Sequence, residues 1–100
     1  VLFLSELEMF LTSLRDNKPL LQEQYGVNTL GVFGSFVRGD QDKNSDVDIL
    51  VEFNEPIGLL KFVALKYQLC EILGKDVDLV MKTALKPKIG ERILEEVIYI

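Results

Sequence analysis

The chain has 100 residues, of which 48% are apolar and 27% charged, with a formal net charge of −5 and no histidine. A chain of this length and composition folds around one core, so we expect residues 1–100 to form a single domain. The acidic balance argues against direct binding of bulk nucleic acid, and without histidine any acid–base or metal chemistry falls to carboxylates, Lys or Tyr.

Neither a membrane nor secretion is indicated. No apolar run approaches the roughly 20 residues that span a bilayer. Glu6 and Glu8 interrupt the apolar positions near the start of the chain, and no basic leader precedes them. The lone Cys70 cannot form an internal disulfide. We therefore expect a cytoplasmic protein without a membrane partner.

The first half of the chain predicts two helices followed by two strands. Ser5 and Glu8 match a capping box ahead of an amphipathic helix over residues 6–16. Pro19 predicts the start of a second, short helix that Gly26 ends. The segments that follow are a strand over 27–33, a helical turn over 35–38, a polar loop over 40–45 and an alternating strand over 46–53.

The second half predicts a helix, a short strand and a final helix. Gly74 caps the first helix, whose apolar stripe runs through Leu59, Phe62, Leu65, Leu69 and Ile72. A strand over 77–81 follows, and Pro87 opens a helix with Ile89, Ile93 and Val97 on one face. Two interpretations of residues 97–100 stay open: they complete the core, or they offer an apolar patch to a partner.

Two acidic pairs stand where strands begin, Asp46-Val47-Asp48 and Asp76-Val77-Asp78. Residues i and i+2 of a strand share a face, so Asp46 and Asp48 stand about 6.5–7 Å apart along the chain on one side. Such carboxylates repel each other unless a cation binds, and Mg²⁺ prefers oxygen ligands. A neighbouring strand could supply a third carboxylate. Asp78 is the best candidate, although Asp76 lies on the same strand face.

The segment before these acids is suited to phosphate. Gly34 has no side chain, so backbone N–H groups can approach an anion closely, and Ser35 adds a hydroxyl at the start of a helical turn. Arg38 lies one turn later and could reach the same phosphates, with an ordinary surface salt bridge as the alternative. The sequence therefore predicts a phosphate-binding segment, which we call the phosphate cradle (Gly34, Ser35 and Arg38), close to the acids that could bind a metal ion.

These residues carry a family resemblance. Gly34-Ser35, ten residues and then Asp46-Val47-Asp48 resemble the Gly-Ser-x10-Asp-x-Asp signature of the DNA polymerase β-like nucleotidyltransferase superfamily. The string GSFVRGDQDKNSDVDILVEF is similar to the minimal nucleotidyltransferase (MNT) branch of that superfamily. The string VDLVMKTALKPKIGERILEEVIYI is similar to the C-terminal part of the same branch, with Asp78 at its third carboxylate position. The resemblance covers residues 27–100.

The resemblance implies an α+β palm, with a mixed sheet of three or four strands flanked by helices. It also implies an enzyme that binds ATP with two Mg²⁺ ions and transfers a nucleotidyl group to a hydroxyl. By family analogy Asp46 and Asp48 hold both metals, while Asp78 holds the catalytic metal and helps to activate the acceptor. Gly34, Ser35 and Arg38 are the expected nucleotide-binding residues.

Members of this branch are commonly antitoxins paired with a HEPN-type ribonuclease toxin, and some add AMP to a tyrosine of that toxin. The resemblance therefore implies a protein adenylyltransferase whose partner is a HEPN-type toxin. Two alternatives are a non-catalytic antitoxin that neutralises its partner by binding, and a nucleotidyltransferase acting on a small molecule or an RNA end.

Overall fold

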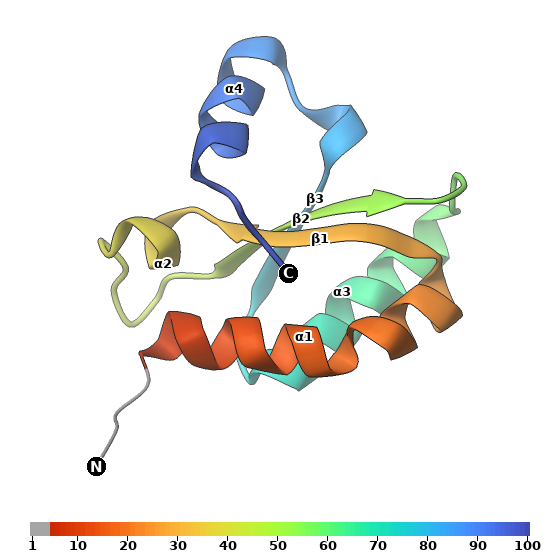
Figure 1. Cartoon of the computed structure of the whole chain (residues 1–100), viewed down its shortest axis with the longest axis horizontal. Helices are drawn as coiled ribbons and strands as arrows, with labels where there is room; N and C mark the ends of the chain where they lie inside the picture. Colours follow the sequence, from red (N-terminus) through yellow and green to blue (C-terminus); the bar gives the residue numbers. More distant parts are fainter. Residues whose placement is uncertain (1–4) are drawn as a thin grey trace.

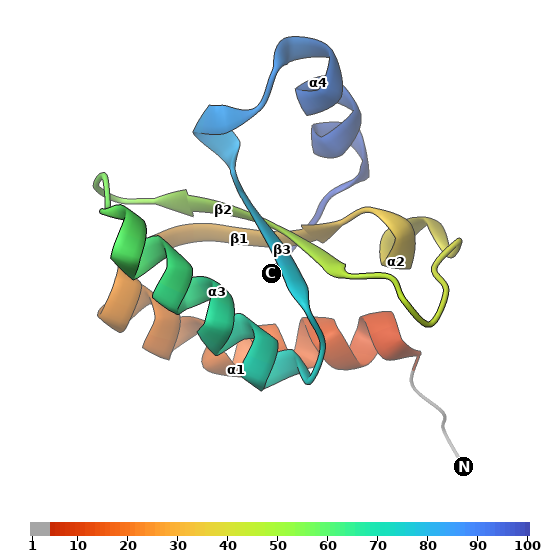
Figure 2. The ribbon, with the colours of Figure 1, turned by 180° about the vertical axis from the view of Figure 1, so that it is seen from behind.

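A computed structural model describes residues 5–100 as a four-stranded β-sheet with helices on both faces (Figure 1). Helices α1 and α3 cover one face and α4 stands over the other, as the view from behind also shows (Figure 2). The elements are α1 (Glu6–Tyr25), β1 (Val27–Phe33), α2 (Ser35–Arg38), β2 (Val47–Phe53), α3 (Leu59–Leu73), β3 (Val77–Met81), the 3₁₀ turn η1 (Lys82–Ala84), α4 (Pro87–Glu96) and β4 (Ile98–Tyr99).

The sheet is mixed, in agreement with the predicted fold class. Its strand order is β3-β2-β1-β4. Strand β1 pairs antiparallel with both β2 and β4, whereas β2 pairs parallel with β3. Strand β2 is therefore hydrogen-bonded on both sides, and its register is fixed by pairing with β1 and with β3.

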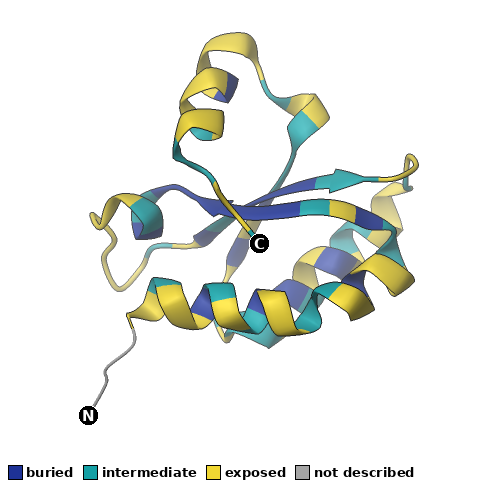
Figure 3. Ribbon diagram, in the orientation of Figure 1, coloured by how far each residue is buried: buried dark blue, intermediate teal, exposed yellow. Residues whose placement is uncertain are grey.

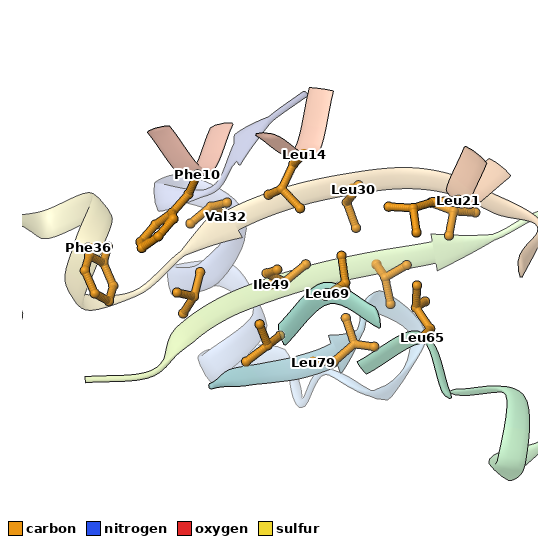
Figure 4. Close-up of a cluster of buried hydrophobic side chains, with 14 residues drawn as sticks. Phe10, Leu14, Leu21, Leu30, Val32, Phe36, Ile49, Leu65, Leu69 and Leu79 are labelled. Atoms are coloured by element: carbon orange, nitrogen blue, oxygen red, sulfur yellow. The ribbon is translucent and has the colours of Figure 1, made fainter. Parts of the chain in front are cut away.

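The hydrophobic core lies between the sheet and the pair α1–α3 (Figure 4). The alternating pattern of β2 sends Val47, Ile49 and Val51 into this core, and all three are fully buried. Burying one such side chain contributes about 1.5–3 kcal/mol, so this face holds the sheet against its helices. Figure 3 shows the contrast between the buried strand centres and the largely exposed α4.

Helix α1 departs from the prediction of two helices. It runs unbroken from Glu6 to Tyr25, with Pro19 inside it. Phe10 and Leu14 before the proline and Leu21 after it are all buried. Three buried side chains contribute more than the roughly 3 kcal/mol that an interior proline costs, so packing keeps the helix continuous. The Ser5 side chain accepts the Glu8 N–H at 3.1 Å, which confirms the N-cap half of the predicted capping box, and the Ser5 hydroxyl donates to the Glu8 carboxylate at 3.3 Å.

The apolar stripe predicted for α3 is correct except at its start. Leu65 and Leu69 are fully buried, whereas Leu59 in the first turn is 75% exposed. The first turn of α3 extends past the core, so the helical periodicity of its sequence overstates how much of the helix is covered. Gly74 ends the helix as predicted, and its N–H donates to the Cys70 carbonyl.

The end of the chain forms a strand that the sequence did not predict. In β4, Tyr99 pairs with Gly31 and Ile98 with Val32, and the Ile100 N–H donates to the Leu30 carbonyl at 3.0 Å. A Cβ on Gly31 would lie 2.6 Å from a methyl of Val97, so glycine at that position allows the close approach. Strand β4 completes the sheet and Ile100 packs against the core, whereas Ile98 is 37% and Tyr99 44% exposed, so this segment both contributes to the core and leaves apolar side chains at the surface.

Within residues 5–100, no helix is both long and apolar enough to cross a membrane.

Replacing Pro19, which is exposed, by alanine should stabilise the protein. Pro19→Ala restores the backbone N–H donor and removes the ring clash, and the expected gain is about 1–3 kcal/mol in the free energy of unfolding, reduced by the greater freedom of the unfolded chain. Urea titration measures it. Asp16→Ala on the same helix is the control and should change stability by less than about 0.5 kcal/mol. No gain for Pro19→Ala would contradict the view that the proline strains α1.

Candidate active site

The antiparallel pairing of β1 with β2 brings Gly34 against Asp48. Phe33, the last residue of β1, pairs with Asp48 in β2, and Gly34 follows it directly. The backbone of Gly34 has φ 86° and ψ −153°, a region that is essentially open only to glycine. A Cβ at this position would collide with the Asp48 carboxylate. The predicted phosphate cradle and one of the predicted metal ligands are therefore in direct contact.

Helix α2 is fixed beside this contact by the core. Phe36, in the middle of α2, is 4% exposed, and its ring meets that of Phe10 edge-on at 5.2 Å between centroids. The ammonium of Lys75 lies 5.5 Å from the centre of the Phe36 ring. Because its central side chain is anchored on α1, this four-residue helix holds Gly34, Ser35 and Arg38 in place at the end of β1.

The parallel pairing of β2 with β3 decides between the two candidate third acids. Asp48 and Asp78 are register partners on adjacent strands, so their side chains emerge side by side on the same face. The Asp76 carbonyl instead accepts the Val47 N–H at 2.9 Å, and Asp76 lies two residues before Asp78, level with Asp46. The geometry therefore makes Asp78 the neighbour of Asp48.

The electrostatics of Asp48 reflect this crowding. Burial raises the pKa of the Asp48 carboxyl to about 6, with further increases from the charges of Asp78 and then Asp46. The nearby Arg38 lowers the pKa only in part. The face thus carries negative charge that the protein itself does not neutralise, which is the environment that a divalent cation would relieve.

The three carboxylates are neighbours without converging on one point. Among residues 5–100, no three acidic, histidine or cysteine side chains are close enough together to hold a metal ion as they stand. Like charges on adjacent strands repel each other when no cation joins them. The donor set fits Mg²⁺ in kind, because all three groups offer hard oxygen ligands on one face of the sheet.

A cavity of about 720 Å³ lies between this face and α4. Gly34, Arg38 and Asp48 form one of its walls. A volume of this size is in the usual range for a bound cofactor or nucleotide. Asp46 instead lines a second cavity of about 520 Å³, together with Lys43, Lys75 and Asp76. The opposite wall of the larger cavity consists of the α4 residues Ile89, Arg92, Ile93, Glu95 and Glu96.

The Glu96 carboxylate accepts hydrogen bonds from two of the predicted phosphate-binding residues. The Gly34 N–H donates to Glu96 Oε2 at 2.7 Å, and the Arg38 guanidinium donates to Glu96 Oε1 at 3.0 Å. Arg38 also pairs with Asp40 at 3.2 Å. The hydrogen bonds from Glu96 first, and then Asp40, raise the pKa of Arg38, which stays a cation. In this structure Arg38 is therefore a member of an ion pair, which is the alternative that the sequence left open, and its binding of phosphate stays a prediction.

Sequence reasoning missed the contribution of α4. It placed Ile89 and Ile93 on one apolar face of the last helix without saying what that face contacts, and in the structure both line the cavity, where Ile89 is 57% exposed. Positions 89, 92, 93 and 96 follow the spacing of one helical face. Because Arg92 and Glu96 alternate with isoleucines on that face, the pattern could have indicated a helix that lines a polar site.

Three comparisons agree on the kind of protein. A family model described as a nucleotidyltransferase domain matches residues 14–100. The chain is 49% identical over 100 residues to the protein adenylyltransferase MntA of Thermococcus cleftensis, which covers 100% of this chain and 98% of the relative. A solved structure of a candidate minimal nucleotidyltransferase superposes with a TM-score of 0.74 at 38% identity, over 88% of this chain and 90% of the other.

A further solved structure adds a ligand and an assembly. It is described as a toxin–antitoxin with AMP-PNP, and one of its chains matches with a TM-score of 0.67 at 27% identity, over 96% of this chain and 72% of the other. The mixed sheet and its flanking helices are thus shared with minimal nucleotidyltransferases.

Substituting Gly34 tests the contact with Asp48, and Gly39 provides a matched control. Gly39 also has a positive φ, 81°, but an added Cβ there would meet open space. Gly39→Ala should therefore lower the free energy of unfolding by only about 1–2 kcal/mol. Gly34→Ala adds the collision with the Asp48 carboxylate and should also abolish nucleotide binding. Urea unfolding and nucleotide titration measure the two effects. Equal losses in the two variants would contradict the proposed contact.

The raised pKa of Asp48 predicts a pH-dependent effect of Asp48→Asn in metal-free buffer. The folded value of about 6 lies above the unfolded value, so the ionised carboxylate destabilises the native state above that pH. Asp48→Asn should therefore melt at a higher temperature than the parent at about pH 7.5, and the difference should vanish as the pH falls to about 4. Thermal unfolding with chelator present measures this, with Asp16→Asn as the control. A difference independent of pH would argue against the assignment.

Proposed function

The chain belongs to the nucleotidyltransferase domain family and is a nucleotidyltransferase, and on that premise we propose that it transfers AMP from ATP to a hydroxyl of a partner protein. The proposed acceptor is a tyrosine of a HEPN-type ribonuclease toxin, which this protein would inactivate as its antitoxin. Residues 1–100 are proposed to act as a single minimal domain in the cytoplasm, where ATP is present.

One observation carries the proposal. Gly34, with its anion-binding N–H group, touches Asp48, and Asp48 is paired in register with Asp78. An anion held by the Gly34 N–H would thus lie beside Asp48 at the wall of a cavity of suitable volume, with Asp78 next to Asp48 on the adjacent strand. This arrangement is the one that a nucleoside triphosphate needs, because its phosphates require donors on one side and cations on the other.

The proposed reaction is a displacement at the α-phosphorus of ATP. The acceptor hydroxyl oxygen attacks that phosphorus, the bond to the β-phosphate oxygen breaks, and pyrophosphate leaves. Asp78 is proposed to take the proton of the hydroxyl, and its exposed position next to Asp48 supports this role. Gly34, Ser35 and Arg38 would bind the phosphates and hold the triphosphate in line.

Asp46 and Asp48 are proposed to hold two Mg²⁺ ions, with Asp78 contributing to the catalytic one. When bound, these ions would neutralise the phosphate charge and stabilise the attacking and leaving oxygens. The raised pKa of Asp48 supports this role, since a cation would relieve the repulsion that raises it.

Two further observations support a protein acceptor. The relative that is 49% identical is named a protein adenylyltransferase, and a chain that is 27% identical belongs to a toxin–antitoxin structure with AMP-PNP. The HEPN class of the toxin and the tyrosine rest on the family resemblance. The net charge of −5 disfavours a nucleic-acid acceptor.

The test combines the purified chain, Mg²⁺, ATP labelled in its α-phosphate, and the product of the neighbouring reading frame. Label should enter the partner protein and pyrophosphate should be released, whereas ATP labelled in its γ-phosphate should give no protein label. Asp48→Asn and Asp78→Asn should lower the rate at least about a hundredfold, because the metal clamp supplies several kcal/mol of transition-state stabilisation.

Asp76→Asn is the matched control, since Asp76 is an exposed acid on the same strand face as Asp78. It should keep most of the activity. No label on a partner verified to bind, or full labelling by Asp78→Asn, would overturn the proposal. Protection of cells by an Asp46→Asn/Asp48→Asn variant that still folds would instead favour neutralisation by binding, and label on an RNA or a small molecule would identify another acceptor.

A further inference from the structure

Glu96 places a carboxylate where the proposed function requires a phosphate. Its two oxygens accept the Gly34 N–H at 2.7 Å and the Arg38 guanidinium at 3.0 and 3.3 Å. These donors are two of the three groups proposed to bind the triphosphate. The Glu96 side chain is 20% exposed and the Arg38 side chain 52% exposed, so the ion pair is shielded from water on the Glu96 side alone.

Glu96 and a phosphate cannot occupy the cradle at the same time. The Gly34 N–H has a single hydrogen, which points at Glu96 Oε2 and cannot donate fully to a second anion. A carboxylate left among the triphosphate oxygens would also repel them at short range. Glu96 must therefore leave these donors before a triphosphate can use them.

We propose that Glu96 is an internal anion that occupies the phosphate cradle when nucleotide is absent, and that nucleotide binds by displacing it. This inference rests on the proposed function, because it assigns a regulatory contact to the same cradle. In this role Glu96 weakens nucleotide binding and keeps Gly34 and Arg38 satisfied in the empty enzyme.

The fold allows this displacement without unfolding. The Val97 N–H donates to the Ile93 carbonyl, and β4 pairs with β1 immediately afterwards, so the backbone on both sides of Glu96 is held. The side chain can leave by rotation about its own bonds.

The test is isothermal titration of the full chain with two probes, AMP-PNP with Mg²⁺ and inorganic tripolyphosphate. Glu96→Gln removes the charge with little change of shape, and both probes should then bind roughly three- to tenfold more tightly, as expected for loss of one competing charge-assisted contact. Glu96→Ala should show the same direction. Thermal unfolding checks that both variants are folded.

Glu95→Gln is the matched control. Glu95 is the adjacent residue and lines the same cavity, but its carboxylate is not the one that Gly34 and Arg38 contact. It carries the same charge, so it should change affinity by less than about twofold if direct occupancy and not the general field is responsible.

The outcomes separate this inference from the proposed function. Unchanged or weaker binding of both probes by Glu96→Gln, in a parent protein that binds AMP-PNP and transfers AMP, would overturn the inference alone and would mean that Glu96 positions Arg38. Equal tightening by Glu95→Gln would also overturn it. Failure of the parent and both Glu96 variants to bind either probe would overturn the proposed function, and the inference with it.

Discussion

The site depends on the position of β2 between two partners. Its antiparallel pairing with β1 brings Asp48 level with Phe33 and hence against Gly34, and its parallel pairing with β3 brings Asp48 level with Asp78. A shift of either register by one residue would turn the facing side chain to the other side of the sheet. The register is secured by the opposite face, where Val47, Ile49 and Val51 are fully buried under α1 and α3.

The two faces of β2 thus differ: one packs in the core and stabilises the fold, and the other carries the acids of the candidate site. The apolar side chains buried on the core face of β2 fix the strand, and this keeps the acidic side chains close together on the opposite face. There, burial and the charges of the two neighbouring acids raise the pKa of Asp48 to about 6. Among residues 5–100, no polar or charged residue is buried in the core, so the crowded acids sit at the edge, where cations can reach them. A bound cation would relieve the repulsion among these acids, as expected for sites that sacrifice stability for function.

Helix α4 gives the site its second wall. It packs on the body through few buried residues, with only Gly90 buried in its length, and its isoleucines border the cavity. Glu96, at its last turn, bonds the cradle directly, while β4 holds the chain beyond it against β1. The end of the chain is therefore part of the site, although it lies about 60 residues from Gly34 in sequence.

Local patterns in the sequence predicted most of the helices and strands and the residues that carry the proposed chemistry. The alternation of β2, the caps at Ser5 and Gly74, and the spacing between Gly34-Ser35 and Asp46 act over short distances, so they could be read directly. Only the tertiary structure decided that α1 continues through Pro19, that residues 98–99 form a fourth strand, and that Asp78 rather than Asp76 stands beside Asp48. It also decided that Glu96 fills the cradle. Each of these depends on packing or pairing between distant segments, and such contacts leave no periodicity in the sequence because the partner is on another element.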